Sequence, residues 1–430
     1  MVSVQSLPNV YFRRRSQMRM LQQIYYGWWI VGACLLVAAI GNALGLFGAG
    51  VYLRAIVETT GWTTGSVSGA ITLFYLVSAV LLIPVGSGIS HIGPRPFIVA
   101  GGLAMAAGVA GIGHVDRPWH VYVLFALMGI GWACLSTTAV ATTLAPWFET
   151  YQGRAVSIAS LGASAGGMLG PPLLLLGRDL VGFAATTSAA AAVALAVVMP
   201  LALLVIRHRP EDMGLSADGG GRAWQDHEPL QSKWICSNAL RTPALVTAMM
   251  AFGIAMSMQI GLLTHQVTLL TRFLQTRMIA ATVSATALSA LVGRLALAAF
   301  ADRISARVTS SIVLLVAAMS FCVLAMAETP TLLIGACMLF GLTVGNVTTL
   351  PPIIVRREFG AASFGPIFGA ASCVIQLAAA VGPSFYGLLH DRLGSYREPL
   401  LIAALMDAVA AAIIMSGRPD GTRPNGQARA

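Results

Sequence analysis

The stretch ATALSALVGRLALAAFADRISAR, residues 285–307, decides the fold. One arginine, Arg294, interrupts an otherwise uncharged run that ends in Asp302 and Arg303. A helix needs about 20 mostly apolar residues to cross a bilayer, and this run with its preceding residues supplies them. Arg294 would then lie near the middle of the membrane, where an arginine costs about 2.5–3.5 kcal/mol on insertion scales. We therefore expect its side chain to face protein or a water-filled cavity and to meet an anion.

The whole chain has the composition of an integral membrane protein. Of its 430 residues, 57% are hydrophobic and 10% are charged, whereas soluble domains carry about a quarter charged residues. Lipid offers the backbone no hydrogen bonds, so apolar runs of spanning length are predicted to be helices. The predicted fold class is an all-α membrane protein with about twelve transmembrane helices. They lie approximately at 26–53, 66–89, 96–114, 119–145, 154–177, 182–206, 243–271, 279–300, 308–326, 330–354, 363–389 and 397–416.

The basic residues predict the orientation of these spans. The net charge is +10, but most of the arginines fall on one side of the predicted topology. The positive-inside rule makes that side cytoplasmic, with both termini. We therefore expect a multi-pass protein of the bacterial cytoplasmic membrane, surrounded by lipid, and no nucleic-acid partner. The arginines on the opposite side are Arg54, Arg117, Arg178, Arg272, Arg277, Arg392 and Arg397.

The chain lacks the motifs of the common enzyme classes. No phosphate-binding Gly-Lys-Ser/Thr loop is present, and the sole lysine, Lys233, lies in a polar stretch between the spans. The six cysteines have no metal-ligand spacing and suggest no disulfide framework. The sequence therefore predicts a protein that is not an enzyme and holds no metal or cofactor.

One long polar stretch divides the spans into two groups of six. The predicted organisation is an N-terminal tail (1–24), a six-helix bundle (25–206), a linker (207–241), a second bundle (242–416) and a C-terminal tail (417–430), with the tails and linker cytoplasmic. The halves also match at one offset of about 212 residues, an internal repeat. This shift places Gly170-Pro171 on Gly382-Pro383. Transporters built from such repeats bind their substrate between the halves, near the middle of the membrane.

Several segments resemble a known family. The loop at 86–95, GSGISHIGPR, and its counterpart ending at Arg307 resemble the signature loops of the major facilitator superfamily. The segments GWWIVGACLLVAA (27–39), Gly61-Trp62 and Trp147-Phe148 through Arg154 resemble its bacterial monocarboxylate transporter branch, to which oxalate/formate exchangers are related. The resemblance covers residues 25–417. It implies two pseudo-symmetric six-helix bundles.

The resemblance also implies a substrate site at Arg294. In that family an arginine of the eighth span, four residues before the signature loop, binds the substrate carboxylate. The alternative is a structural arginine that pairs with backbone carbonyls or with Asp407. The family's lysine in the first span is replaced by Phe47. The acid or asparagine that proton-symporting members often carry one turn before the arginine is replaced by Ala290. A single fixed cation suits a monoanion better than a dianion, whose second charge would have no partner.

Other polar residues are predicted inside the spans. Histidine changes its charge near physiological pH, so His265 is a candidate proton carrier or substrate ligand; a neutral, hydrogen-bonded structural histidine is the alternative. Asp407 is a second candidate proton carrier, with a structural role as its alternative. The remaining candidate substrate ligands are Asn42, Tyr75, Gln259, Asn346 and Gln376. Each could equally make a helix–helix hydrogen bond or pack in the core.

The signature loops predict a cytoplasmic gate. Asp302 is expected to accept hydrogen bonds from the N-terminus of the fifth span near Arg154, where a helix dipole favours an anion. Ser90 occupies the equivalent position in the first half and carries no charge. We therefore expect an asymmetric gate of Ser90, Arg95, Arg154, Asp302 and Arg303.

Together these observations predict a monomeric secondary transporter that moves a small carboxylate by alternating access. Whether protons accompany the anion is left open by the sequence. The alternatives are an exporter of amphipathic or aromatic compounds, an organic-anion exchanger, and a transporter-like receptor that senses an anion. The receptor is disfavoured because the central linker is short and has no recognisable signalling motif.

Overall fold

A computed structural model describes residues 25–148, 151–219, 236–300 and 305–417. Among these residues there are helices, turns and loops but no strand. The α-helices of the first half are α2 (Tyr26–Leu44), α3 (Ala49–Thr60), α4 (Thr64–Ile92), α5 (Pro94–Ile112), α6 (Pro118–Leu135), α7 (Thr137–Leu144), α8 (Gln152–Val181) and α9 (Phe183–Pro200). Those of the second half are α11 (Pro243–Leu270), α12 (Thr276–Phe300), α13 (Ala306–Met326), α14 (Pro330–Phe359), α15 (Ala361–Ala379), α16 (Gly382–Leu393) and α17 (Arg397–Ser416). Short helical turns between the halves are η1 (Leu201–Val205), η2 (Glu211–Met213), η3 (Ala217–Gly219) and α10 (Cys236–Ala239).

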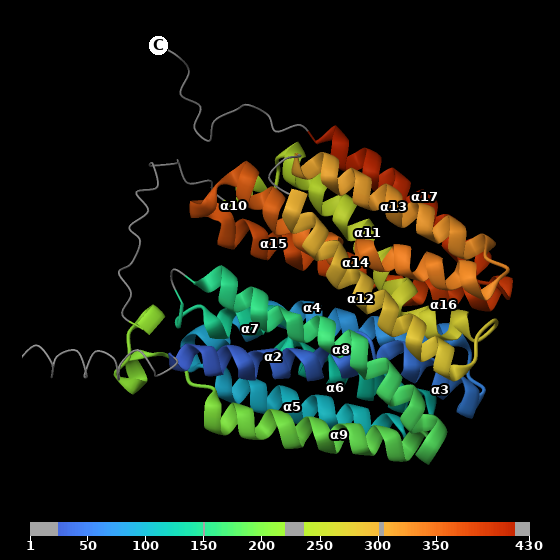
Figure 1. Cartoon of the computed structure of the whole chain (residues 1–430), viewed down its shortest axis with the longest axis horizontal. Helices are drawn as coiled ribbons and strands as arrows, with labels where there is room; N and C mark the ends of the chain where they lie inside the picture. Colours follow the sequence, from blue (N-terminus) through green and yellow to red (C-terminus); the bar gives the residue numbers. More distant parts are fainter. Residues whose placement is uncertain (1–24, 149–150, 220–235, 301–304, 418–430) are drawn as a thin grey trace, which may run out of the picture.

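The described helices form 12 spans long and apolar enough to cross a membrane, which confirms the predicted fold class. The first-half helices pack mainly on one another, and so do those of the second half. In Figure 1 the blue and green helices accordingly lie on one side and the yellow to red helices on the other. The end of the molecule where α2 begins and α9 ends is called the linker end below. The opposite end, with the turns before α4, α12 and α17, is called the distal end.

Local sequence explains where the helices begin. Proline lacks the N–H that a first helical turn leaves unbonded, and its φ angle already suits a helix. Threonine and serine side chains accept hydrogen bonds from free N–H groups of the first turn. Prolines occupy the first turns of α5, α6, α11 and α14 at Pro94, Pro118, Pro243 and Pro330. Capping side chains precede α4, α7, α11, α13 and α14 at Thr63, Ser136, Thr242, Ser305 and Thr329.

Three spans are interrupted where a single helix was expected. The first span breaks at 45–48, between α2 and α3, and the fourth breaks at Ser136, whose extended backbone ends α6 and caps α7. The eleventh span breaks at Ala380 and Val381, just before Gly382-Pro383. By contrast, α8 continues as a helix through Pro171 and Pro172. The equivalent Gly-Pro pairs therefore differ: the pair of the second half follows a break between α15 and α16, whereas the pair of the first half lies inside the continuous helix α8.

The small residues of α8 form a packing face. A side chain on Gly162, Gly166 or Gly170 would collide with α2, near Leu35, Ala39 and Ala43 respectively. The spacing of four residues on each helix brings the two backbones together along one stripe, as small-residue stripes do between membrane helices. These glycines therefore allow the close approach of α2 and α8.

Two of the segments that carry the family resemblance, the start of α2 and Trp147-Phe148, meet at the linker end of the first bundle. The Trp28 and Phe148 rings lie 5.1 Å apart, and Tyr25 meets Phe148 edge-on at 5.7 Å. The backbone carbonyl of Trp147 accepts hydrogen bonds from the Tyr25 hydroxyl (3.0 Å) and from the Asp218 N–H (3.1 Å). The start of the linker is thus attached to the first bundle through the same aromatic cluster.

Candidate functional site

Arg294 lies less than two turns from the linker-end terminus of α12. Because α12 begins at the distal end and side chains tilt towards a helix N-terminus, the side chain points back towards the middle of the membrane. Its two hydrogen-bond partners, Ser164 and Gly345, lie near the middle of α8 and α14. Both of those helices have 30 residues and exceed the thickness of the bilayer core. The guanidinium is therefore at mid-membrane depth.

The contacts of Arg294 join the two bundles. Its Nη1 donates to the Ser164 hydroxyl of α8 at 3.3 Å, and its Nε donates to the Gly345 carbonyl of α14 at 3.4 Å. Both distances exceed the usual 2.7–3.2 Å for an N–H donor. A side chain on Gly345 would lie 2.5 Å from Cγ and 2.8 Å from Nε of Arg294. Gly345 therefore makes the space in which the arginine lies.

No carboxylate forms an ion pair with Arg294 among the residues that the structure describes. Asp407, the alternative partner considered from the sequence, is buried in α17, and its Oδ1 has no hydrogen-bond partner. A half-buried guanidinium with two long, neutral hydrogen bonds is incompletely satisfied, since five N–H donors are available. The position suits an anion that contacts both bundles.

The other predicted ligands are placed at several locations. Asn42 is buried and donates to the Ala38 carbonyl of its own helix at 2.8 Å. Tyr75 packs edge-on against Phe74 and Trp132, and its buried hydroxyl makes no hydrogen bond of good geometry. These contacts also fit the core-packing alternative. The structure gives no polar contact between either residue and Arg294.

Three amides of the second bundle were predicted as ligands. Gln259 of α11 and Asn346 of α14 are buried, and each has a side-chain oxygen without a hydrogen-bond partner. The Asn346 amide nitrogen donates to the Leu342 carbonyl at 3.1 Å. Gln376 of α15 is half-buried. Asn346 follows Gly345 directly, so of these residues it is the closest in sequence to the contacts of Arg294.

His265 lies elsewhere, near the distal end of α11. Its Nδ1 is 2.9 Å from the Tyr396 hydroxyl, and its Nε2 is 3.0 Å from the Pro383 carbonyl and 3.2 Å from the Ser68 hydroxyl. Along the axis of α12, Arg294 lies about 27 Å from the distal end of the helix. The structure therefore does not bring His265 together with Arg294, and its hydrogen bonds fit the structural alternative considered from the sequence.

A set of polar contacts closes the two bundles against each other at the distal end. The N–H of Gly65, at the start of α4, donates to the Asp391 carboxylate of α16 at 2.7 Å. The hydroxyls of Thr72 and Ser384 lie 2.8 Å apart, one from each bundle. Together with the Ser68–His265 contact, these bonds join α4 to the second bundle. We call this set the distal latch.

The proposed gate at the linker end is only partly described. Asp302 and Arg303 lie outside the described residues. Ser90 is exposed and donates to the Gly86 carbonyl of its own helix, whereas Arg95 donates to the Ile206 carbonyl at 2.7 Å. Both bonds stay within the first bundle.

Arg154 is also exposed, and its guanidinium lies 5.8 Å from the centre of the Trp28 ring. It therefore joins the aromatic cluster of the first bundle at the beginning of α8. An expected contact between this helix N-terminus and Asp302 falls on a residue outside the described part of the chain.

Sequence reasoning missed two parts of the candidate site and one structural ion pair. The two parts of the site are Ser164 and Gly345, which no sequence pattern assigns to Arg294. Arg307 forms a bidentate ion pair with Glu358, at 2.7 and 2.8 Å, and also donates to the carbonyls of Ala244 and Ile414. Opposite charges near the ends of consecutive spans were the available signal for that pair.

Comparisons with known proteins agree with this architecture. The family model of the Major Facilitator Superfamily matches residues 35–383 and, in a second match, 268–429. Monocarboxylate transporter 13 of Bos taurus is 24% identical over 330 residues, which cover 74% of this chain and 73% of that protein. Multidrug resistance protein MdtH of Yersinia enterocolitica is 32% identical over 114 residues, but the match covers only 26% of this chain and 28% of that protein.

Solved structures show the same fold. A bacterial homolog of the human lysosomal transporter Spinster, in an inward-facing and unoccupied conformation, superposes with a TM-score of 0.69 at 14% identity. The match covers 93% of this chain and 100% of that structure. With 12 spans in two packed bundles and a family model that covers most of its length, the chain is a multi-pass membrane transporter, not an enzyme, and it belongs to the Major Facilitator Superfamily.

Proposed function

We propose that the protein is a secondary transporter of a small monocarboxylate, whose carboxylate binds to Arg294. The observation that carries the proposal is a guanidinium at mid-membrane depth, between the bundles, with two long hydrogen bonds and no carboxylate partner among the described residues. A carboxylate can replace these contacts by two parallel, charge-assisted hydrogen bonds.

The position of Arg294 also supports a transport cycle. Ser164 belongs to the first bundle and Gly345 to the second, so an anion at the guanidinium would lie where the bundles meet. Closing the site around a bare arginine would bury an unpaired charge, which is costly. Binding of the anion neutralises that charge and favours the occluded state. The two bundles then rock around the bound substrate.

A monocarboxylate fits the described residues better than a dicarboxylate. The predicted ligands near mid-depth other than Arg294 carry no positive charge, so a second carboxylate would lack a cationic partner. The unpartnered oxygens of Gln259 and Asn346 are acceptors, so they suit a hydroxyl or other donor group on the substrate rather than another anion. The similarity to monocarboxylate transporter 13 supports the same substrate class.

We further propose that the transporter works as a monomer in a bacterial cytoplasmic membrane, with the linker end in the cytoplasm. The arginine distribution supports this orientation.

Uptake by purified protein in liposomes tests the proposal. Radiolabelled acetate, lactate, pyruvate and benzoate are compared, with Arg294→Gln and Arg294→Lys beside the unchanged protein. We expect Arg294→Gln to lower carboxylate uptake at least about tenfold, a loss of about 1.4 kcal/mol or more in transition-state binding. Arg294→Lys should retain part of it, because lysine keeps the charge but not the planar pair of donors. The control is Arg392→Gln, at an exposed distal-end arginine. Normal accumulation by Arg294→Gln would refute the proposal.

The local similarity to MdtH favours one alternative, an exporter of amphipathic or aromatic compounds. The same liposomes distinguish it. Such an exporter would transport lipophilic cations or dyes without any carboxylate requirement, and Arg294→Gln would leave that flux unchanged.

A further inference from the structure

The hydrogen bonds of His265 in the distal latch define the tautomer of its neutral ring. A backbone carbonyl can only accept, so the 3.0 Å contact with Pro383 requires a hydrogen on Nε2. The Ser68 hydroxyl already donates to the Thr64 carbonyl at 2.7 Å and can accept from the same Nε2–H. In the neutral ring Nδ1 then carries no hydrogen and accepts from the Tyr396 hydroxyl. A neutral imidazole therefore satisfies all of these contacts.

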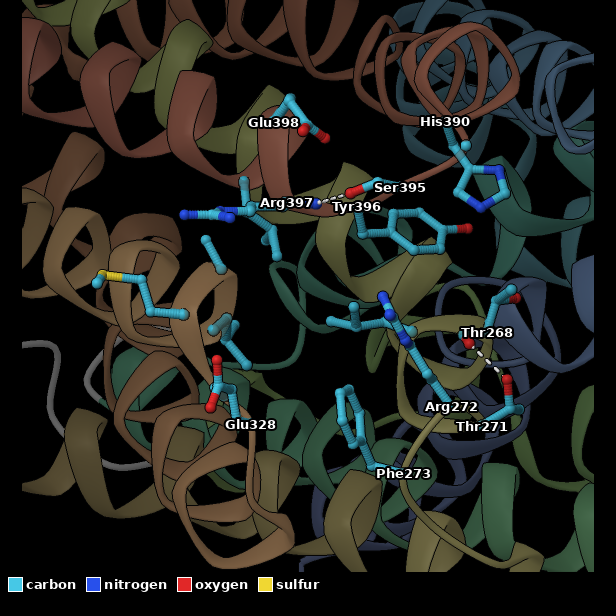
Figure 2. A pocket seen from close by; sticks show the side chains of 17 residues that line it. Thr268, Thr271, Arg272, Phe273, Glu328, His390, Ser395, Tyr396, Arg397 and Glu398 are labelled. Carbon is cyan, nitrogen blue, oxygen red and sulfur yellow. Dashed lines mark hydrogen bonds between the residues drawn. The ribbon is translucent and has the colours of Figure 1, made fainter.

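A water-accessible pocket reaches the residues beside this ring. The pocket has a volume of about 790 Å³ at the distal end of the second bundle, and Tyr396, His390 and Thr268 line it. Figure 2 shows Tyr396 and His390 beside each other on one side of the pocket and Thr268 below them. The rings of His390 and Tyr396 stack at 4.3 Å. Tyr396 thus connects the pocket to His265, which is completely buried.

Tyr396 has the contacts of a proton relay. Burial, and to a smaller extent the charge of Asp391, raise the pKa of its phenol above the usual value, so it keeps its hydrogen and can donate it. The hydroxyl of Thr268 lies beside it and has no hydrogen-bond partner of good geometry. The Tyr396 hydroxyl can therefore turn from His265 Nδ1 towards Thr268 Oγ1. In that orientation its oxygen can accept a hydrogen bond from the imidazole ring.

The charges around His265 decide which state of the latch a proton would favour. No carboxylate is paired with the ring among the described residues, and Asp391 is held by the Gly65 N–H. The ionisable groups around the ring come mainly from one side: Tyr386, His390 and Asp391 of α16, and Tyr396 before α17. On the other helices, α3 carries Arg54, which is paired with Glu58, and α14 carries Cys337. Helix α4 presents the neutral hydroxyl of Ser68 to the ring. A second proton would therefore leave a buried, unpaired positive charge between the bundles, which is costly until water reaches it.

We propose that His265 is a proton-binding site that controls the distal latch, and that Tyr396 supplies its proton from the distal pocket. In the step, Tyr396 gives its hydroxyl hydrogen to Nδ1 and takes a proton from a hydronium ion in the pocket, which leaves water and regenerates the phenol. The imidazole gains one positive charge. The Nε2–H stays in place, but the buried charge is now stabilised by water, so the two bundles part at the distal end and water reaches the ring. This site does not depend on the identity of the transported compound.

Distance measurements between two spin labels test the proposal without any substrate. The full chain, with its six cysteines replaced by serine, carries Thr59→Cys and Leu393→Cys. These exposed positions lie at the distal ends of α3 and α16, one in each bundle. In lipid nanodiscs we expect the population with the longer label distance to rise several-fold from pH 8 to pH 5. The His265→Gln protein, which keeps an amide donor and acceptor but cannot take up a proton, should show no such change.

Two tyrosine variants provide a matched comparison. Tyr396→Phe removes the relay hydroxyl, and we expect it to reduce the pH response or shift its midpoint. Tyr386→Phe removes a buried hydroxyl that has no hydrogen-bond partner, from a ring stacked on His265 at 5.8 Å, and should respond like the parent protein. A distance distribution that is independent of pH in the parent protein overturns the proposal. An equal pH response in His265→Gln, or equal effects of both tyrosine variants, also overturns it.

Discussion

At the scale of single residues, the candidate anion site depends on how one arginine is accommodated. Its part of α12 packs on the middle of α14 beside Gly345, and its side chain tilts towards the N-terminus of α12. The missing side chain of Gly345 leaves room for the stem of Arg294, and Ser164 approaches from the other bundle. A charged group at this depth is tolerated only where protein or water surrounds it.

The substitution Gly345→Ala tests this accommodation. The added methyl group would lie 2.5 Å from Arg294 Cγ, so the guanidinium must move. We expect the KM for the transported carboxylate to rise at least about fivefold, roughly 1 kcal/mol. The new methyl also approaches the Ala290 carbonyl, at 2.5 Å, so the unfolding temperature is measured in the same preparation.

Gly335→Ala is the matched control on the same helix, because a methyl group there meets nothing within 4 Å. It should leave KM unchanged, and the better helix propensity of alanine should preserve stability. Equal KM values for the two variants would contradict the role given to Gly345.

At the scale of the elements, a single ion pair connects four helices of the second bundle. Arg307 at the start of α13 pairs with Glu358 at the end of α14 and donates to the carbonyls of Ala244 in α11 and Ile414 in α17. The exposed side-chain fractions are only 11% for Arg307 and 13% for Glu358. The bundle is therefore held at its linker end by charge and hydrogen bonding in addition to apolar contact.

We expect Glu358→Gln to destabilise the protein strongly, because it leaves a buried guanidinium without its counter-charge. Breaking such a buried pair costs about 3–5 kcal/mol. Thermal unfolding in detergent measures the change. Glu58→Gln is the comparison, since Glu58 pairs with Arg54 and Arg178 but is 42% exposed; exposed pairs contribute about 0–1 kcal/mol. The role of Arg307 as a helix junction is wrong if the two variants lose equal stability.

At the scale of the whole molecule, the described hydrogen bonds between the bundles run from mid-depth to the distal end. They begin at Arg294–Ser164, continue through the 2.7 Å contact of the Ser284 hydroxyl with the Met168 carbonyl, and end in the distal latch. The protein is therefore closed at its distal end, and we expect transport to require the opening of this end.

A covalent bond across the latch should stop transport. The Thr72 and Ser384 hydroxyls lie 2.8 Å apart, so the pair Thr72→Cys and Ser384→Cys, in a chain without its native cysteines, should form a disulfide on oxidation. We expect uptake to fall to about one-tenth or less and to return after reduction, since the bond prevents separation of the bundles. Each single-cysteine variant under the same oxidant is the control. Full uptake by the cross-linked protein would show that the distal end need not open.

The orientation in the membrane is a further whole-molecule prediction. The positive-inside rule places the linker end in the cytoplasm, because basic residues cluster in its connections. Fusion of alkaline phosphatase to the C-terminus should therefore give an inactive enzyme, and fusion of green fluorescent protein should give fluorescent cells. A fusion after Asp116, in the turn between α5 and α6, should give the opposite pair of results. The reverse pattern would contradict the predicted topology.

The sequence by itself determined the class of fold and the unusual residue. Lipid cannot satisfy a free backbone, so long apolar runs could only be spanning helices, and an arginine inside one of them needed a polar environment. These inferences need only the properties of lipid as a solvent and the chemistry of residues that are close together in the chain, so the linear sequence is enough for them.

Only the tertiary structure decided where those helices break and which side chains meet. The break at Ser136 and the unbroken path of α8 through Pro171 depend on neighbouring helices that can satisfy or crowd the backbone. The contact of Arg294 with Ser164 crosses the bundle interface, as does that of His265 with Ser68. Such pairings join residues far apart in the chain, so their geometry is set by the packing of the two bundles and not by any local pattern.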